Sequence, residues 1–242
     1  MLLAGILLMA KPALADSYYP YEIQGYDVTV KVGKDNVYHV TERLQVNFNQ
    51  ARHGIYRDIP VINNVSREDG STSRIQARVT NIKTYGEKKT VGREGSYCRI
   101  QLGDKNKTLV GEHMYHISYD YNMGKDVRKG EDEFYYNIIG TSWDTTIQNV
   151  TFHIMMPEDI DESKVGMAYG ESGSTNNEGL QYTINGKVME GYVDPSIILN
   201  PGEAVTVRMV LPDGYYDQVK QRIWPALISI LLSLAAAGAA FL

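Results

Sequence analysis

Apolar and polar side chains alternate along most of the chain. In YDVTVKV the apolar positions are Tyr26, Val28, Val30 and Val32, and the runs YHVTERLQVNF, YHISYDY, VTFHIM and VTVRMVL repeat this spacing. A period of two is typical of a strand that buries one face. Stretches such as VGKDN, EDGS and NPGE separate the runs and indicate turns. No run before Ile223 has a helical period of useful length, so the pattern predicts an all-β protein.

Short turns without crossover helices favour antiparallel strands packed in two layers. We therefore predict an antiparallel immunoglobulin-like β-sandwich of about ten to twelve strands. That number exceeds a single seven-stranded sandwich, so the chain forms either one large sandwich or two small ones in tandem. In the second case the break lies near residues 122–133, NMGKDVRKGEDE, which are polar and contain glycine.

Two charged residues occupy positions that the alternation reserves for core side chains. Glu42 lies on the apolar face of YHVTERLQVNF, and Arg57 lies on the apolar face of GIYRDIPV. A lone charge in a core is strongly destabilising, whereas a guanidinium and a carboxylate can form two parallel hydrogen bonds. We therefore predict a Glu42–Arg57 pair that is at least partly buried; the alternative is a bulge that turns one side chain outward. A structural role is favoured, although Arg52, His53 and Asp58 nearby would suffice for a small polar site.

Both ends of the chain are apolar. Residues 1–15, MLLAGILLMAKPALA, end in the small-x-small triplet of a secretory cleavage site and are predicted to be a signal peptide or an N-terminal anchor. Residues 223–242 carry no charge and are long enough for a transmembrane helix, with Trp224 at the position of a headgroup-layer indole. We expect residues 16–215 to form the β-sandwich region between these segments.

The signal-like start predicts that the β-sandwich region is extracytoplasmic and attached to the cell membrane. Lys220 and Arg222 precede the apolar stretch and point weakly to the opposite orientation, but two residues carry less weight than the N-terminal segment. No basic cluster follows the apolar stretch. We therefore expect that the chain is cut short at the first span of a longer membrane protein.

Charge and composition limit the classes of partner. Residues 16–222 contain 23 of the 24 Lys and Arg residues and all 29 Asp and Glu residues, so this region is acidic and unsuited to nucleic acid. Cys98, the single cysteine, shares the parity of Ile100 and is predicted to be a small buried side chain rather than a nucleophile. The five histidines are scattered, so no metal site is predicted. The acidic runs 131–133 and 158–162 lack the spacing of calcium loops and are expected to be solvated.

The sequence contains no signature of catalysis. A G-x-S-x-G elbow is absent, and the polar stretch GESGSTNNEG, 170–179, is not flanked by a strand and a helix as a phosphate loop would be. Strands can bring any two carboxylates together for glycoside cleavage, but nothing singles out a pair. Trp143 and most tyrosines are expected to pack in the core rather than stack on a ligand. We predict no catalytic residue and no cofactor.

Three stretches carry a family resemblance. VTERLQVNF followed by HGIYRDIP, and DEFYYNIIGTSWDTTIQNVTFHIMMP at 132–157, are similar to patterns of the DUF2207 family of predicted membrane proteins; ILNPGEAVTVRMVLPDG is similar to the closing strand of that family. The resemblance implies a signal sequence, an extracytoplasmic β-domain and following membrane spans, without an assigned activity. The matching positions are Glu42, His53, Gly54, Arg57, Pro60, Gly140 and Trp143.

These features together favour a membrane-anchored extracytoplasmic β-sandwich that serves as a binding, interaction or sensory module. Its expected partners are the membrane and an envelope protein or glycan. One alternative is an envelope enzyme that acts on a cell-wall polymer, which turnover of such a polymer by the purified region would favour. Another is a structural part of a larger membrane assembly. An enzyme is the less favoured class, because no catalytic motif supports it.

Overall fold

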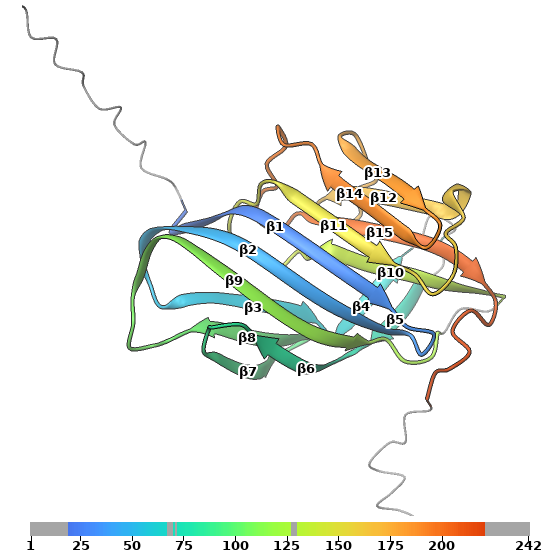
Figure 1. Cartoon of the computed structure of the whole chain (residues 1–242), viewed down its shortest axis with the longest axis horizontal. Helices are drawn as coiled ribbons and strands as arrows, with labels where there is room; N and C mark the ends of the chain where they lie inside the picture. Colours follow the sequence, from blue (N-terminus) through green and yellow to red (C-terminus); the bar gives the residue numbers. More distant parts are fainter. Residues whose placement is uncertain (1–18, 67–69, 71, 127–129, 221–242) are drawn as a thin grey trace, which may run out of the picture.

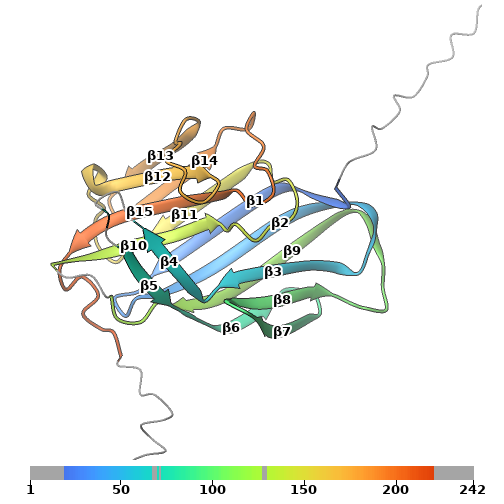
Figure 2. The same ribbon diagram turned by 180° about the vertical axis from the view of Figure 1, so that it is seen from behind.

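The computed structural model describes residues 19–66, 70, 72–126 and 130–220. These residues form two packed layers of β-strands, seen from one side in Figure 1 and from the other in Figure 2. The predicted terminal segments 1–15 and 223–242 lie outside the described residues. Within the described ranges, no helix is both long enough and apolar enough to cross a bilayer.

Fifteen strands and one short 3-10 helix make up the described part of the chain. In order, they are β1 (Tyr21–Val32), β2 (Val37–Arg52), β3 (Gly54–Pro60), β4 (Ile62–Ser66), β5 (Thr72–Gln76), β6 (Arg78–Thr84), β7 (Lys89–Glu94), β8 (Tyr97–Gly103), β9 (Leu109–Asn122), β10 (Glu131–Ile139), β11 (Val150–Met155), η1 (Glu162–Lys164), β12 (Val165–Gly170), β13 (Leu180–Asn185), β14 (Val188–Val193) and β15 (Ala204–Pro212). The prediction of an all-β fold is confirmed. The strands outnumber the ten to twelve predicted, because exposed strands such as β7 show no apolar alternation.

One layer is a seven-stranded sheet in the order β13-β14-β11-β1-β2-β9-β6. It forms the front of the molecule in Figure 1. Strands β1 and β11 run parallel, with Tyr26 opposite Val150 and Lys31 opposite Met155, so the expectation of purely antiparallel sheets is wrong. Parallel strands need a long crossover connection, and here strands β2 to β10, which belong to both layers, connect β1 to β11 in place of a helix.

The second layer consists of two three-stranded sheets, β10-β15-β12 and β3-β8-β7, with the β4-β5 hairpin beside them. Figure 2 shows these strands in front of the seven-stranded sheet. Strands from both sides of residues 122–133 enter the seven-stranded sheet, since β1, β2, β6 and β9 precede this stretch and β11, β13 and β14 follow it. The immunoglobulin-like type of the sandwich stays a prediction.

The core lies between the two layers. The inward positions predicted for YDVTVKV, YHVTERLQVNF, YHISYDY and VTFHIM are all buried, Glu42 included. In VTVRMVL the positions Val205, Val207 and Met209 are buried, whereas Leu211 near the strand end is half-buried. Cys98 is also half-buried, less than predicted, and its side chain packs against the edge of the core.

Candidate functional site

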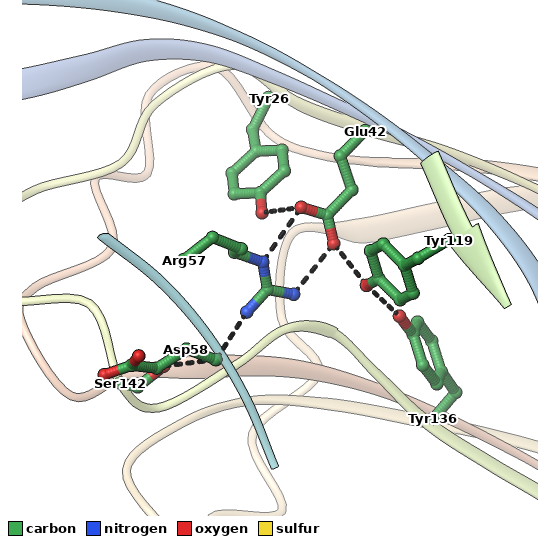
Figure 3. Close-up of polar contacts among 7 residues, drawn as sticks. All are labelled: Tyr26, Glu42, Arg57, Asp58, Tyr119, Tyr136 and Ser142. Atoms are coloured by element: carbon green, nitrogen blue, oxygen red, sulfur yellow. Dashed lines mark hydrogen bonds and ion pairs between the residues drawn. The ribbon is translucent and has the colours of Figure 1, made fainter. Parts of the chain in front are cut away.

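Glu42 on β2 and Arg57 on β3 meet in the core between the two layers (Figure 3). The Arg57 Nε donates to Glu42 Oε2 at 2.9 Å, and its Nη2 donates to Glu42 Oε1 at 2.8 Å. Their side chains are 2% and 0% exposed, so this is the two-point pair that the parity of both strands predicts, with both charges removed from water.

Two tyrosines complete the shell around the carboxylate, and a third contacts one of them. Tyr26 donates to Glu42 Oε2 at 2.8 Å, and Tyr119 donates to Oε1 at 2.6 Å. The hydroxyls of Tyr119 and Tyr136 lie 2.9 Å apart, which extends the network to β10 in the other layer. Glu42 therefore accepts four hydrogen bonds, the saturation that a buried carboxylate requires.

The remaining face of the guanidinium is also occupied. Arg57 Nη1 donates to the backbone oxygen of Asp58 at 2.8 Å, and Ser142 Oγ donates to the same oxygen at 2.9 Å. The Trp143 ring lies 5.7 Å from the Arg57 guanidinium carbon. A Cβ at Gly140 would lie 3.8 Å from Nη1, so this glycine lines the guanidinium without crowding it.

The electrostatics of the cluster keep the pair ionised. Burial is the largest single effect and would raise the pKa of Glu42, but the Arg57 charge and the hydrogen bonds from Arg57 and two tyrosines together outweigh it, so the pKa of Glu42 is lowered. Burial is the largest single effect and would lower the pKa of Arg57, but Glu42, through its charge and hydrogen bonds, together with Tyr26 and Tyr119 raises it. Burial raises the pKa of Tyr26 and Tyr119, so both hydroxyls stay neutral donors.

This cluster leaves no room for a substrate. The cavity beside Arg57, lined also by Pro60, Tyr136 and Gly140, holds about 20 Å³, the space of roughly one water molecule. The pair instead joins β2 of the large sheet to β3 of the small sheet, with Tyr136 of β10 and the segment after β10 packed around it. Its chemistry is that of a cross-link through the core.

The other motif positions have separate structural roles. His53 is exposed, and its Nδ1 lies 2.8 Å from the backbone oxygen of Lys107. Gly54 pairs with Gly103 and has a φ of +134°, where a Cβ would lie 1.8 Å from the Leu102 oxygen. Pro60 ends β3 and accepts a hydrogen bond from the Tyr121 hydroxyl at 2.8 Å. Glu42, Arg57, Pro60, Gly140 and Trp143 thus gather around one cluster, whereas His53 and Gly54 lie at the other end of β3.

The first acidic run differs from its prediction. Asp132 and Glu133 are buried in β10 rather than solvated. Asp132 accepts from the backbone nitrogen of Tyr216 at 3.0 Å, and Glu133 accepts from Arg208 Nε at 2.6 Å, so neighbouring strands and the C-terminal segment hold both carboxylates. The second run, 158–162, is mostly exposed, as expected. The described residues contain no group of three or more His, Cys, Asp or Glu side chains placed to hold a metal ion.

The outer face of the seven-stranded sheet carries a groove of about 630 Å³. Its lining includes Asp27, Thr29, Arg43, Thr151, His153 and Glu190, which come from β1, β2, β11 and β14. This volume lies in the range of ligand sites, and the groove is open along the sheet face. The alternation of apolar and polar residues did not reveal this groove, because outward polar residues are expected on any solvated strand. The available signal was Met114, an apolar side chain at an outward position that lines the groove, with the exposed ring of Tyr192 beyond the lining on the same sheet face.

One row of side chains crosses this groove at right angles to the strands. Five residues lie side by side in the strand register, one on each of five neighbouring strands. They are Tyr192 of β14, Thr151 of β11, Asp27 of β1, Arg43 of β2 and His116 of β9. Neighbouring strands lie about 4.8 Å apart, so this cross-strand row is about 19 Å long. Tyr85, which follows β6, extends the row because its ring stacks on His116 with centroids 4.0 Å apart.

The polar groups of the groove contact one another loosely. Thr151 Oγ1 donates to Asp27 Oδ2 at 2.9 Å, whereas Arg43 Nη1 approaches Asp27 Oδ1 only to 3.9 Å. The two ring nitrogens of His153 lie 3.7 Å from Asp27 and 3.4 Å from Glu190. The side chains of the two carboxylates, the histidine and the arginine in these contacts are between 31% and 61% exposed, so they remain available to a ligand.

The fold and the buried pair define an all-β domain whose two layers are joined through the core by an ion pair. The family described as the N-terminal domain of predicted membrane proteins (DUF2207) matches residues 22–211. The chain belongs to this family, which confirms the resemblance of its motifs. The description of the family supports a membrane location for the protein.

Comparison with other proteins adds a limited likeness in shape. No curated protein matches the chain. An M1 zinc metallopeptidase from Deinococcus radiodurans superposes with a TM-score of 0.40 at 9% identity, covering 78% of this chain and 42% of the peptidase. Leukotriene A4 hydrolase from Saccharomyces cerevisiae superposes with a TM-score of 0.43 at 5% identity, covering 84% of this chain and 31% of the hydrolase. This chain therefore spans less than half of the length of either protein.

Proposed function

We propose that this protein is a membrane-anchored, extracytoplasmic interaction module that binds its partner on the outer face of the seven-stranded sheet. The groove of about 630 Å³ on that face carries the proposal. Inside the described part of the chain, the cavity beside Arg57 holds only about 20 Å³, the one beside Asn36 about 50 Å³, and the ion pair is saturated. A binding role therefore belongs to the open sheet face.

The sidedness of the domain rests on the terminal segments and the family. The family is described as one of predicted membrane proteins. Residues 1–15 resemble a signal peptide or anchor, and residues 223–242 are long and apolar enough to span a bilayer. A domain between such segments is exported when the first of them directs translocation.

The position of the C-terminal end suits this arrangement. Gln218 N donates to Lys34 O at 3.2 Å, so the described chain ends beside the turn that follows β1. Strand β1 has 12 residues, and at about 3.3 Å per residue its start lies about 40 Å away. Figure 1 shows the described chain ending at one end of the seven-stranded sheet. An anchor after Lys220 would hold that end of the domain and leave the sheet face between the two ends uncovered.

Cysteine labelling tests the sidedness directly. Cys98 is replaced by Ala, and Ser174, in the exposed segment between β12 and β13, is replaced by Cys. Intact cells are then treated with a membrane-impermeant maleimide, with the Cys98→Ala protein as the unlabelled control. Labelling of Cys98→Ala/Ser174→Cys in intact cells is the expected result. Labelling only after lysis would place the domain in the cytoplasm and overturn the proposal.

A further inference from the structure

The cross-strand row has an exposed aromatic ring near each end. Tyr192 lies at the β14 end and is 41% exposed, and Tyr85 lies beyond the β9 end and is 57% exposed. Both rings belong to the outer face, on which most other side chains are polar. An exposed tyrosine ring offers an apolar face and a hydroxyl edge together. This combination suits a ligand that is itself apolar on one face and polar at its rim, as a sugar ring is.

Hydrogen-bonding groups of opposite kinds lie between the two rings. Asp27 presents acceptor oxygens, and Arg43, 59% exposed, presents guanidinium donors that reach Asp27 only at 3.9 Å. Thr29 and Thr151 add hydroxyls on either side. A sugar hydroxyl both donates and accepts, so neighbouring hydroxyls on one ring can pair with the carboxylate and the guanidinium at once.

The charge of the groove opposes a polyanion. Its lining carries the carboxylates of Asp27 and Glu190 against the one guanidinium of Arg43. Burial and the nearby Arg43 charge lower the pKa of His116, so this imidazole is neutral at pH 7 and adds no positive charge to the row. Binding of a phosphate-rich or uronic polymer depends on concentrated cationic side chains. An uncharged ligand suits this surface better.

A protein partner suits the middle of the row less well. The buried centres of protein interfaces are depleted in charged residues. A protein covering this face would remove Asp27 and Arg43 from water, although their 3.9 Å contact lacks the two short hydrogen bonds of Glu42 with Arg57. A hydrated polyol can keep both charges hydrogen-bonded, directly or through water.

We infer that the outer face of the seven-stranded sheet binds an uncharged polysaccharide, which lies along the cross-strand row with sugar rings stacked near Tyr192 and Tyr85. The inference deepens the proposed function and rests on it, since such polymers occur on the extracytoplasmic side. The ligand follows the row rather than the strands, because the aromatic groups and the Asp27–Arg43 centre lie on that line.

Binding of neutral oligosaccharides by the full-length protein in detergent tests the inference. The probes are hexasaccharides of β-1,4-linked N-acetylglucosamine and of β-1,4-linked glucose, with heparin as the polyanionic comparison, measured by isothermal titration. We expect one neutral probe to bind better than heparin. Tyr192→Ala removes a stacked ring and Arg43→Ala removes a charged hydrogen-bond donor. Each variant is expected to weaken the binding of that probe by about tenfold or more.

Matched variants on the other layer provide the control. Tyr56 on β3 is 55% exposed, close to the value for Tyr85, and Arg93 on β7 is an exposed arginine. Tyr56→Ala and Arg93→Ala should leave the affinity within about twofold, since neither lies on the outer face of the large sheet. Tyr192→Phe should retain binding, because it keeps the ring. Equal effects of Tyr56→Ala and Tyr192→Ala, or tighter binding of heparin, would refute the inference.

Cross-linking in cells separates the failure of this inference from failure of the proposed function. A photoreactive residue is placed at Thr29, which lines the groove. Cross-linking to a polysaccharide should give adducts of widely varying size, which a glycan-degrading enzyme removes. A single discrete protein adduct would overturn the polysaccharide and leave an interaction module. If neither neutral probe binds but the membrane-impermeant maleimide labels Cys98→Ala/Ser174→Cys in intact cells, the polysaccharide is again overturned and the interaction module remains. Labelling only after lysis would instead end the proposed function.

Discussion

Replacing Arg57 with Met is the sharpest test of the buried pair. Methionine is of similar length and fits an apolar core, so the change removes the charge with little loss of volume. It leaves Glu42, which is fully buried, with hydrogen bonds from Tyr26 and Tyr119 alone. Two of its four hydrogen bonds and the whole opposing charge are lost.

The expected loss of stability follows from the burial of both partners. Breaking a buried ion pair by removing one side costs about 3–5 kcal/mol, because an uncompensated charge stays in the core. For a domain of this size the melting temperature should fall by about 6–20 °C. Arg99→Met is the matched control, since Arg99 makes the same two-point contact with Asp58, at 2.8 and 2.7 Å, but is 37% exposed. That change should cost about 1 kcal/mol or less.

The pH dependence of the loss gives a second signature. In the parent protein the pKa of Glu42 is lowered from 4.5, so its contribution is present above pH 4.5 and is lost as pH falls through the folded pKa. In Arg57→Met, burial is no longer outweighed and should raise the folded pKa of Glu42 above 4.5. The variant should then gain stability as pH falls toward 4.5, so its deficit is smaller at pH 5 than at pH 8.

Urea unfolding of residues 16–222 supplies the measurement, followed by the fluorescence of Trp143, whose ring lies over Arg57. The double variant Glu42→Gln/Arg57→Met removes both charges and should recover at least half of the loss. The reasoning is refuted if Arg57→Met and Arg99→Met cost the same, or if the double variant is as unstable as Arg57→Met. A deficit in Arg57→Met that does not change between pH 5 and pH 8 would contradict the assignment to Glu42.

Two further predictions concern single positions. Gly54→Ala should destabilise the protein by about 3 kcal/mol or more, because the φ of +134° and the Leu102 oxygen exclude a Cβ. Gly92 lies in open space, so Gly92→Ala should change the stability by less than about 0.5 kcal/mol. Thermal melts of both variants check this prediction. Burial raises the pKa of the Cys98 thiol, so a thiol reagent at pH 8 should modify the native protein more slowly than the urea-unfolded protein, and equal rates would contradict the packing of this side chain.

Much of the candidate site could be predicted from local spacing. The pairing of Glu42 with Arg57 follows from parity, because each strand places one charge on its apolar face and a buried charge needs an opposite partner. The sequence did not reveal that Tyr26, Tyr119 and Tyr136 would complete the shell. Their parity marked them as core residues, but hydroxyl contacts depend on the spacing of strands that are distant along the chain.

The sequence by itself determined which face of each long strand is buried, since a period of two is a property of the single chain. It also favoured a buried pair of opposite charges over a bulge that would turn one of them outward. Only the tertiary structure decided that β1 and β11 pair in parallel and that Asp132 and Glu133 are buried. The cross-strand row was likewise settled by strand register, which brings Asp27, Arg43 and Tyr192 onto one line although up to 165 positions separate them. Register depends on contacts between strands, and alternation within one strand carries no information about its neighbours.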